Sequence, residues 1–287
     1  KNPKKPIPEG MEIVNSKFPR QILYEMWNKV NIPKVENLAK SVDLVHASGG
    51  AIPSTDLPLV ATIHDLSWRE QNNWFPSRGK RFGETWLNKA RKAERIICSS
   101  ETTFKDLVKA GFDEQIISVV PLGVKKRKVD KEQVEGLLKK NSIRTPFVLW
   151  VGTIEPRKNI PTLLKAMQQI PEIPLVLVGP KGWESDLQSA IEPMKDRVKI
   201  IGEVDEATKH IWYEAASVFC FPSLMEGFGL PIAEAMSHGT PVVTSSTTAT
   251  SEVAGDAALL IDPKSADVIA ESIKEILNNP ELAEELS

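Results

Sequence analysis

The sequence has few of the side chains that bind structural metals. It contains two cysteines and four histidines in 287 residues, and no Cys/His cluster. Structural zinc sites take about four such ligands at close spacing, so the sequence offers no zinc site. Cys98 and Cys220 lie within or at the end of apolar runs. This position favours buried free thiols over a disulfide and predicts a cytoplasmic protein.

Other missing features exclude further classes of protein. No run approaches the roughly 18 apolar residues of a membrane-spanning helix, and no secretory signal is recognisable. No G-x-G-x-x-G follows a predicted strand, which argues against a hydride-transferring dinucleotide enzyme. The lysine-rich stretch Lys125 to Lys140 has no interleaved aromatic residues, so we expect no nucleic-acid partner. The remaining composition, 41% hydrophobic and 26% charged, is that of an ordinary soluble protein of two domains.

Charge is unevenly distributed along the chain. Residues 1–128 hold 22 Lys and Arg against 14 Asp and Glu, a net +8, and the remainder carries −10. A basic first half could rest on anionic lipid headgroups or accept a lipid-phosphate substrate, but scattered solvated Lys and Arg explain the number as well. Peripheral contact with the inner membrane face therefore stays an open alternative.

Short apolar runs alternate with helical segments along almost the whole chain. This alternation is typical of α/β folds with parallel sheets. It predicts two domains, 1–124 and 125–287, with Lys125 to Lys140 as the linker and the first helix after it. In the first domain we expect strands at 42–46, 59–63, 95–98 and 116–120, and helices at 20–30, 34–39, 81–94 and 101–109. In the second we expect strands at 147–151, 175–178, 198–201, 218–221, 241–244 and 258–261, and helices at 160–169, 183–194, 206–216, 230–238 and 266–278.

The stretch from Phe221 to Val243 carries two carboxylates, Glu226 and Glu234, across a junction between a loop and a helix. Pro231 suits the first turn of a helix and Gly239 the position after its end, which predicts a helix from Leu230 to His238. Glycines in the preceding loop allow backbone N–H groups to approach a ligand closely, and the helix N-terminus offers partial positive charge. Such a site suits a diphosphate.

Each candidate residue has a functional and a structural interpretation. Glu226 would lie near the reacting end of a diphosphate ligand, and Glu234 could accept two hydrogen bonds from ribose hydroxyls. Alternatively, Glu226 is a solvated loop residue and Glu234 the partner of a nearby lysine. Arg157 and Lys158 would neutralise a diphosphate, or they are solvated surface. Because ligands bind beyond the carboxyl ends of parallel strands, we expect one cleft lined by residues that follow strand runs: His46, His64, Gly152, Gly179 and Glu226.

The sequence around the two carboxylates resembles a known family. SLMEGFGLPIAEAMSHGTPVV, residues 223–243, resembles the Glu-x7-Glu segment of the retaining glycosyltransferases of family four. VGTIEPRKN (151–159), TIHDLS (62–67) and VVPLGV (119–124) resemble further motifs of that family, so the resemblance spans about residues 40 to 265. It implies the GT-B fold, in which two Rossmann-like, doubly wound domains face each other across a cleft.

The resemblance implies a role for each matching residue. Glu226 would contact the donor sugar, and His64 would lie beside it from the acceptor side, making these two the catalytic candidates. Lys158 and Arg157 would hold the diphosphate, and Glu234 the ribose. The full set expected to bind the nucleotide is Arg157, Lys158, Glu234, Gly227, Phe228, Gly229, Leu230, Gly152 and Val204. The base would lie near Gly179 and residues 202–204.

The implied activity is hexosyl transfer without a metal. The GTIEPRKN form resembles members that use GDP-mannose, so we expect a GDP-sugar donor rather than a UDP-sugar, and no resident cofactor. The acceptor would be a saccharide or a lipid-linked saccharide, as in polysaccharide biosynthesis. A nucleotide-sugar-binding protein without transferase activity and a nucleotide-sugar epimerase are the alternatives. Family members usually begin with a strand and a glycine-rich loop and end with a helix that crosses back. Neither is recognisable here, so we expect a chain truncated at both ends, with an incomplete N-terminal domain.

Overall fold

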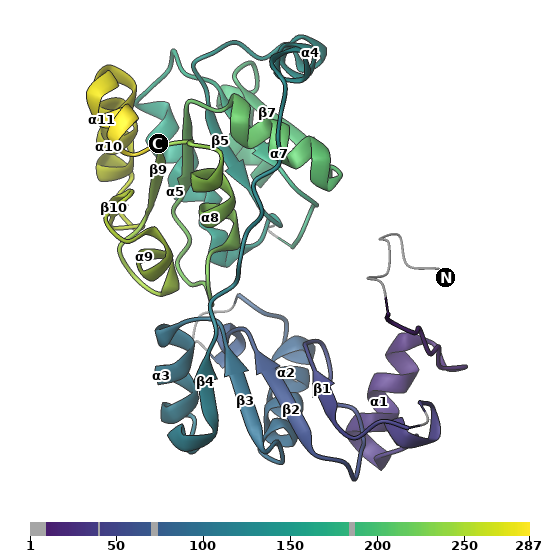
Figure 1. Cartoon of the computed structure of the whole chain (residues 1–287). Helices are drawn as coiled ribbons and strands as arrows, with labels where there is room; N and C mark the ends of the chain where they lie inside the picture. The colour runs from purple at the N-terminus through teal and green to yellow at the C-terminus, as the bar shows by residue number, and fades with distance from the viewer. Residues whose placement is uncertain (1–9, 40, 70–73, 184–186) are drawn as a thin grey trace.

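The chain forms two parallel β-sheets, each with its own helices, in two domains joined by a single extended segment (Figure 1). The computed structural model describes residues 10–39, 41–69, 74–183 and 187–287. The predicted α/β fold of two Rossmann-like domains is confirmed.

The N-terminal domain contains a four-stranded sheet in the order β1-β2-β3-β4, with every neighbouring pair parallel. Helix α2 connects β2 to β3, and α3 connects β3 to β4. Helix α1 precedes the sheet and lies to one side of it in Figure 1. The elements are α1 (Arg20–Val30), β1 (Val45–Ala47), β2 (Leu59–Ile63), α2 (Ser77–Ala90), β3 (Arg95–Cys98), α3 (Glu101–Lys109) and β4 (Ile117–Val119).

The C-terminal domain contains a six-stranded sheet in the order β10-β9-β8-β5-β6-β7. Its strands are β5 (Val148–Val151), β6 (Leu175–Val178), β7 (Val198–Gly202), β8 (Val218–Phe221), β9 (Val242–Ser245) and β10 (Leu259–Ile261). Its helices are α4 (Lys131–Asn141), α5 (Ile160–Gln168), α6 (Leu187–Ile191), α7 (Glu206–Ala215), α8 (Leu230–Ser237), α9 (Ala249–Ala254), α10 (Ala266–Asn278) and α11 (Pro280–Glu285).

The order of the second sheet reverses between β5 and β8. The chain builds outward from β5 to β7, then returns to the other side of β5 and continues through β9 to β10. Every residue of β5, β6, β8 and β9 is buried, as is usual for parallel strands covered on both faces. The point of reversal is where open α/β sheets bind ligands, so the loops after β5 and β8 are the first place to look for a site.

Some predicted helices differ from those observed. Residues 34–39 were predicted as a helix, but only a three-residue 3-10 helix, Val35–Asn37, forms there. Backbone and side-chain bonds from this segment to Ser54, Thr55 and Asp56 hold it in that short form. The predicted helix 81–94 is α2, which begins earlier, at Ser77. It contains Gly83 because a Cβ there would lie 2.6 Å from the Trp68 ring.

Two further differences concern the C-terminal domain. The predicted helix 183–194 is observed as α6 followed by a 3-10 helix, Glu192–Met194, while residues 184–186 lie outside the described part of the chain. Helix α9 was not predicted, because six residues are too few to show a helical period. Residues 1–10 are rich in Lys and Pro, a composition that predicts an unstructured lead or a loop within a domain; apart from Gly10 they lie outside the described residues.

Candidate functional site

A buried cluster of charges lies where the loops after β5 and β8 meet. Arg157 and Lys158 occupy a 3-10 helix, Pro156–Lys158, directly after β5, and Glu226 lies in the loop between β8 and α8. Glu226 Oε1 accepts a hydrogen bond from Lys158 Nζ at 2.6 Å, and its Oε2 accepts one from Arg157 Nη1 at 2.7 Å. Arg157 Nε lies 2.6 Å from Glu155 Oε1. Glu226 is only 7% exposed, so it is not the solvated loop residue of the alternative interpretation.

Backbone and amide hydrogen bonds hold the two loops together. Asn159 Nδ2 donates to the carbonyl of Pro222, in the loop after β8, at 3.1 Å, and to that of Pro263, in the loop after β10, at 2.6 Å. The Leu224 N–H donates to the Arg157 carbonyl at 2.8 Å. The charged side chains are therefore presented by loops whose backbones are fixed to each other.

The charges in this cluster control one another's protonation. Burial alone would raise the pKa of Glu226, but the charges and hydrogen bonds of Lys158 and Arg157 outweigh it, so this pKa lies below the usual value for a glutamate. Burial lowers the pKa of Lys158, although the Glu226 carboxylate opposes that shift. Burial also raises the pKa of Glu155. At neutral pH the cluster therefore holds an ionised Glu226 beside the Arg157 guanidinium and the Lys158 amine.

The start of α8 lies against this cluster. Gly229 precedes the helix with φ +100°, a conformation that favours glycine, and Pro231 falls in its first turn as predicted. Phe228 is half-buried, and Leu230 is 37% exposed. Gly227 has a structural role that sequence reasoning missed. A Cβ at this position would lie 1.9 Å from the His64 carbonyl oxygen, so its lack of a side chain lets the two domains meet.

Glu234 is bound by residues of α7. Its Oε1 accepts a hydrogen bond from Lys209 Nζ at 2.8 Å, and its Oε2 accepts one from Tyr213 Oη at 2.9 Å. The structural interpretation of Glu234, as the partner of a nearby lysine, is therefore confirmed. Each carboxylate oxygen of Glu234 has two lone pairs and uses one of them in these bonds. The carboxylate can therefore accept two further hydrogen bonds, as binding of a ribose would require.

The histidines of the N-terminal domain differ from each other in position. His64 follows β2 and is exposed, and its backbone carbonyl faces Gly227. Asp65 is not its partner, because Asp65 Oδ1 accepts from the Ser67 N–H at 3.0 Å and from the Ser67 hydroxyl at 2.6 Å. His46 was expected after a strand, but it lies within β1 and contacts Thr62 Oγ1 at 2.8 Å.

Glycines bring the loops after β5 and β6 together. A Cβ at Gly179, which has φ +140°, would lie 1.9 Å from the Gly152 carbonyl oxygen. The Gly179 N–H donates to the Gly202 carbonyl at 2.8 Å. Val204, two residues further on, is partly buried against the core of the domain. Gly152, Gly179 and residues 202–204 thus follow neighbouring strands at one edge of the sheet. That the base lies near Gly179 and residues 202–204 stays a prediction.

Four side chains that build this site were not singled out from the sequence. Glu155 and Asn159 belong to the quoted VGTIEPRKN motif, and that motif was the available signal for them. Lys209 and Tyr213 lie on α7, where nothing in the sequence connects them to Glu234. Among residues 10–39, 41–69, 74–183 and 187–287, no three His, Cys, Asp or Glu side chains are grouped to hold a metal ion. In the same ranges no helix is long and apolar enough to cross a membrane.

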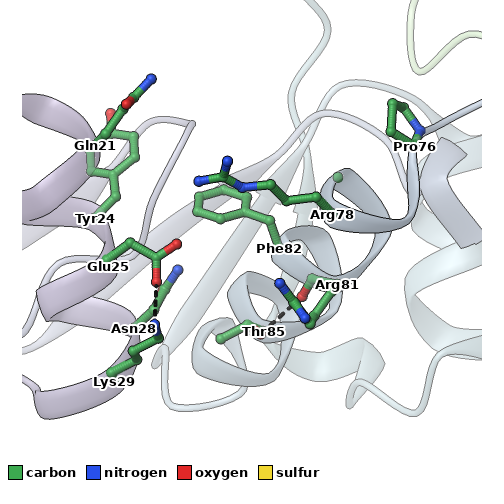
Figure 2. Close-up of a pocket in the computed structure, with 11 residues that line it drawn as sticks. Gln21, Tyr24, Glu25, Asn28, Lys29, Pro76, Arg78, Arg81, Phe82 and Thr85 are labelled. Carbon is green, nitrogen blue, oxygen red and sulfur yellow. Dashed lines mark hydrogen bonds and ion pairs between the residues drawn. The ribbon is translucent and has the colours of Figure 1, made fainter.

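A cavity of 1180 Å³ lies elsewhere, between α1 and α2 (Figure 2). Tyr24 and Phe82 line it, and their rings stack with centroids 6.3 Å apart. Arg78 and Arg81 extend from α2, and Lys29 on α1 pairs with Glu25 at 3.0 Å. The predicted site residues do not line this cavity.

The two halves of the chain match two families of known proteins. Residues 135–287 match the family described as Glycosyl transferases group 1, and residues 3–128 match Glycosyltransferase Family 4. The chain is 33% identical to the Escherichia coli protein O-antigen chain mannosyltransferase B over 233 residues, which are 77% of this chain and 61% of that protein. It is 35% identical to the Mycolicibacterium smegmatis phosphatidyl-myo-inositol mannosyltransferase over 143 residues, 47% of this chain and 37% of that protein. The chain thus spans about three fifths or less of these two relatives.

The fold has solved counterparts. The crystal structure of Anabaena HepE in complex with UDP and glucose matches 85% of this chain and 72% of that chain with a TM-score of 0.72, at 20% identity. This likeness identifies the two-domain arrangement as the GT-B fold. With its C-terminal half matched from residue 135 to residue 287, the chain belongs to the glycosyl transferases group 1 family.

Proposed function

We propose that this protein transfers a hexose, with mannose favoured, from a nucleoside-diphosphate sugar to an acceptor hydroxyl with retention of the anomeric configuration. The observation that carries the proposal is the buried Arg157–Glu226–Lys158 cluster at the point where the strand order reverses. Support for mannose comes from the two mannosyltransferases that resemble the chain. The preference for GDP over UDP rests on the GTIEPRKN sequence alone.

The cations of the cluster can exchange one anionic partner for another. Arg157 and Lys158 are already directed at a carboxylate, so a diphosphate entering beside α8 would meet two oriented donors and the positive end of the helix. Glu226 would then face the donor sugar. Glu234 would accept the ribose hydroxyls while remaining bonded to Lys209 and Tyr213.

Transfer then needs little more than positioning and charge stabilisation. The bond between the anomeric carbon and the diphosphate oxygen breaks, and the acceptor oxygen bonds to that carbon on the same face. The acceptor proton passes to the leaving diphosphate. Arg157, Lys158 and the N-terminus of α8 stabilise the negative charge that develops on this leaving group, so we expect transfer in the presence of EDTA.

The cavity between α1 and α2 suits the acceptor. Arg78 and Arg81 offer charge to a phosphate, and Tyr24 and Phe82 offer aromatic faces to a sugar ring (Figure 2). Pro76 lines one edge of this cavity. The preceding residue, Phe75, has its ring centroid 5.9 Å from that of Trp183 in the C-terminal domain. We therefore assign this groove to a saccharide or lipid-linked acceptor. The same arginines would favour contact with an anionic membrane surface.

Calorimetric titration of GDP, UDP and ADP in EDTA tests the donor site. We expect micromolar binding of one nucleotide, weakened about 10- to 100-fold in Lys158→Ala, because a charged hydrogen bond to phosphate contributes about 1.5–3 kcal/mol. Lys165→Ala is the matched control, since Lys165 is exposed on the helix that follows the same loop.

Each contrary outcome has a definite meaning. Binding of none of the three nucleotides, or binding unaffected by Lys158→Ala, contradicts the assigned donor site. Nucleotide binding without turnover of GDP-mannose favours the alternative of a binding protein. Conversion of the donor to its epimer without acceptor favours an epimerase.

A further inference from the structure

The two domains meet through a cluster of hydroxyl groups at the start of α3. Ser99 and Ser100 follow β3, and Thr103 lies in the first turn of α3; all three are buried. The Gly227 carbonyl of the C-terminal domain accepts from Ser99 Oγ at 3.0 Å and from Ser100 Oγ at 2.8 Å. Gly227 directly follows Glu226, so these bonds hold the backbone of the residue next to the candidate catalytic glutamate.

Each of the three hydroxyl groups has one proton to donate, so each can be assigned one acceptor. A carbonyl oxygen has two lone pairs, and Ser99 and Ser100 fill those of Gly227. Thr103 Oγ1 lies 3.1 Å from the His64 carbonyl and 3.3 Å from that of Gly227, so its single proton is assigned to His64. Ser100 Oγ also accepts the Thr103 N–H at 3.1 Å. The cluster therefore ties the backbone of His64 in one domain to that of Gly227 in the other.

A carboxylate from the C-terminal domain completes this contact. Glu252 on α9 accepts hydrogen bonds from the N–H groups of Glu101, at 2.8 Å, and Thr102, at 2.7 Å, and from the Thr102 hydroxyl. These N–H groups are the first two of α3 and have no partner within the helix. Glu252 thus caps a helix of the opposite domain, and α9 lies beside α3 in Figure 1.

We propose that Ser99, Ser100, Thr103 and Glu252 form a latch that holds the Glu226 loop in its working position when the two domains are closed. These are positioning residues, because they act through the backbones of Gly227 and His64. Opening the domains would break the bonds that cross between them, from Ser99 and Ser100 to Gly227 and from the start of α3 to Glu252, and would release the loop. The expected loss of kcat rests on the proposed transfer function, whereas the latch itself does not.

Glu252→Gln and Ser99→Ala test the latch. We expect at least a tenfold loss in kcat for mannosyl transfer from GDP-mannose to methyl α-mannoside, and the same loss in the slow hydrolysis of GDP-mannose. The Kd for GDP should stay within twofold, because Arg157 and Lys158 are untouched. In Glu252→Gln, hydrogen exchange at the Glu101 and Thr102 amides should accelerate at least tenfold.

Ser265→Ala is the control. Ser265 caps α10 within the C-terminal domain, so this variant loses a helix cap without touching the latch, and its kcat should be unchanged. Unchanged amide exchange in Glu252→Gln would overturn the latch, whether or not the protein turns over GDP-mannose. If kcat falls as much in Ser265→Ala as in Glu252→Gln and Ser99→Ala, the positioning role of the latch is overturned. If the unaltered protein neither binds GDP nor hydrolyses GDP-mannose, the proposed function fails while amide exchange still tests the latch.

Discussion

Glu226 lies in the interior as an ion, and its surroundings decide its chemistry. Two cations contact one carboxylate oxygen each, at 2.6 and 2.7 Å, and lower the pKa of the group against the effect of burial. The cluster is therefore both a structural ion pair and the proposed contact to the donor sugar. These two roles can be separated by removing the charge while keeping the shape.

Glu226→Gln should reduce transfer about 100-fold or more and leave GDP binding at least as tight, since two cations lose a competing anion. Measurement of kcat and of the Kd for GDP checks this. Glu271→Gln, an exposed glutamate on α10, is the control and should change neither. Normal turnover in Glu226→Gln would remove Glu226 from the mechanism.

The same substitution has a signature in stability. Because the folded-state pKa of Glu226 is depressed, its ionised form stabilises the fold above the unfolded value of 4.5, and this stabilisation is lost as pH falls through the folded pKa. Denaturant unfolding should therefore show a smaller loss of stability below pH 4.5 in Glu226→Gln than in the unaltered protein. At pH 7 the variant should be less stable by up to about 3 kcal/mol, because buried cations lose their partner.

The sequence predicted that the candidate side chains follow strands at one edge of the sheet, but not that they would bond to each other. The sequence indicated Arg157, Lys158 and Glu226 through the strands they follow, and the structure brings them within hydrogen-bonding distance. Their roles toward a donor remain predictions. Lys209 and Tyr213 were missed because contacts between two helices depend on how the helices pack, which a helical period does not encode.

At the scale of elements, buried strands were the most predictable part of the fold. β2, β3, β6 and β8 begin and end at the predicted residues, because each coincides with a short apolar run in the sequence. Short helices were the least predictable. Residues 34–39 form only a 3-10 turn because contacts to residues 54–56 decide their conformation, and α9 is too short to show a period. The latch carboxylate Glu252 was overlooked for that reason.

The groove between α1 and α2 supports a prediction of its own. Replacing Arg78 and Arg81 together with alanine should raise KM about tenfold for an α-mannosyl phosphodiester acceptor and less for methyl α-mannoside, because only the former offers an anion to the guanidinium groups. The Kd for GDP should not change. Arg95→Ala, an exposed arginine outside the groove, is the control. If the KM for each acceptor is the same in the double variant as in the unaltered protein, the acceptor does not bind in this groove.

At the scale of the whole molecule, the two domains have separate apolar cores. One core gathers around β5 to β10 and the other around β1 to β4. The hydroxyl groups of the latch are buried, but Glu252 is exposed, so its contact with the start of α3 is accessible to salt. Residues 1–124 hold 18 Lys and Arg against 14 Asp and Glu, a net +4, and residues 125–287 hold 18 against 24, a net −6, so the two domains also attract each other at long range.

Raising the ionic strength from about 0.01 M to 1 M should open the molecule, because the screening length falls from about 30 to 3 Å. Small-angle scattering should then show the radius of gyration increasing by about 1–2 Å, against about 19 Å for a compact chain of this length. In Glu252→Gln the radius of gyration should change less with ionic strength, because this variant has already lost the charged contact of Glu252 with α3. A radius independent of salt would show that charge does not hold the domains together.

The polar contact between the domains has a consequence for recombination. Where Gly227 meets the N-terminal domain, its partners are a backbone carbonyl and short hydroxyl side chains, and none of them is a large apolar residue shared by both cores. To keep the contact with Gly227, a foreign N-terminal domain would need a serine pair before the helix that matches α3 and a close-approaching turn after its second strand. It would also have to keep the N–H groups that Glu252 caps and the ring contact of Phe75 with Trp183. Acceptor-binding halves could thus be exchanged between relatives without redesigning either interior, which would let new glycans arise by shuffling whole domains.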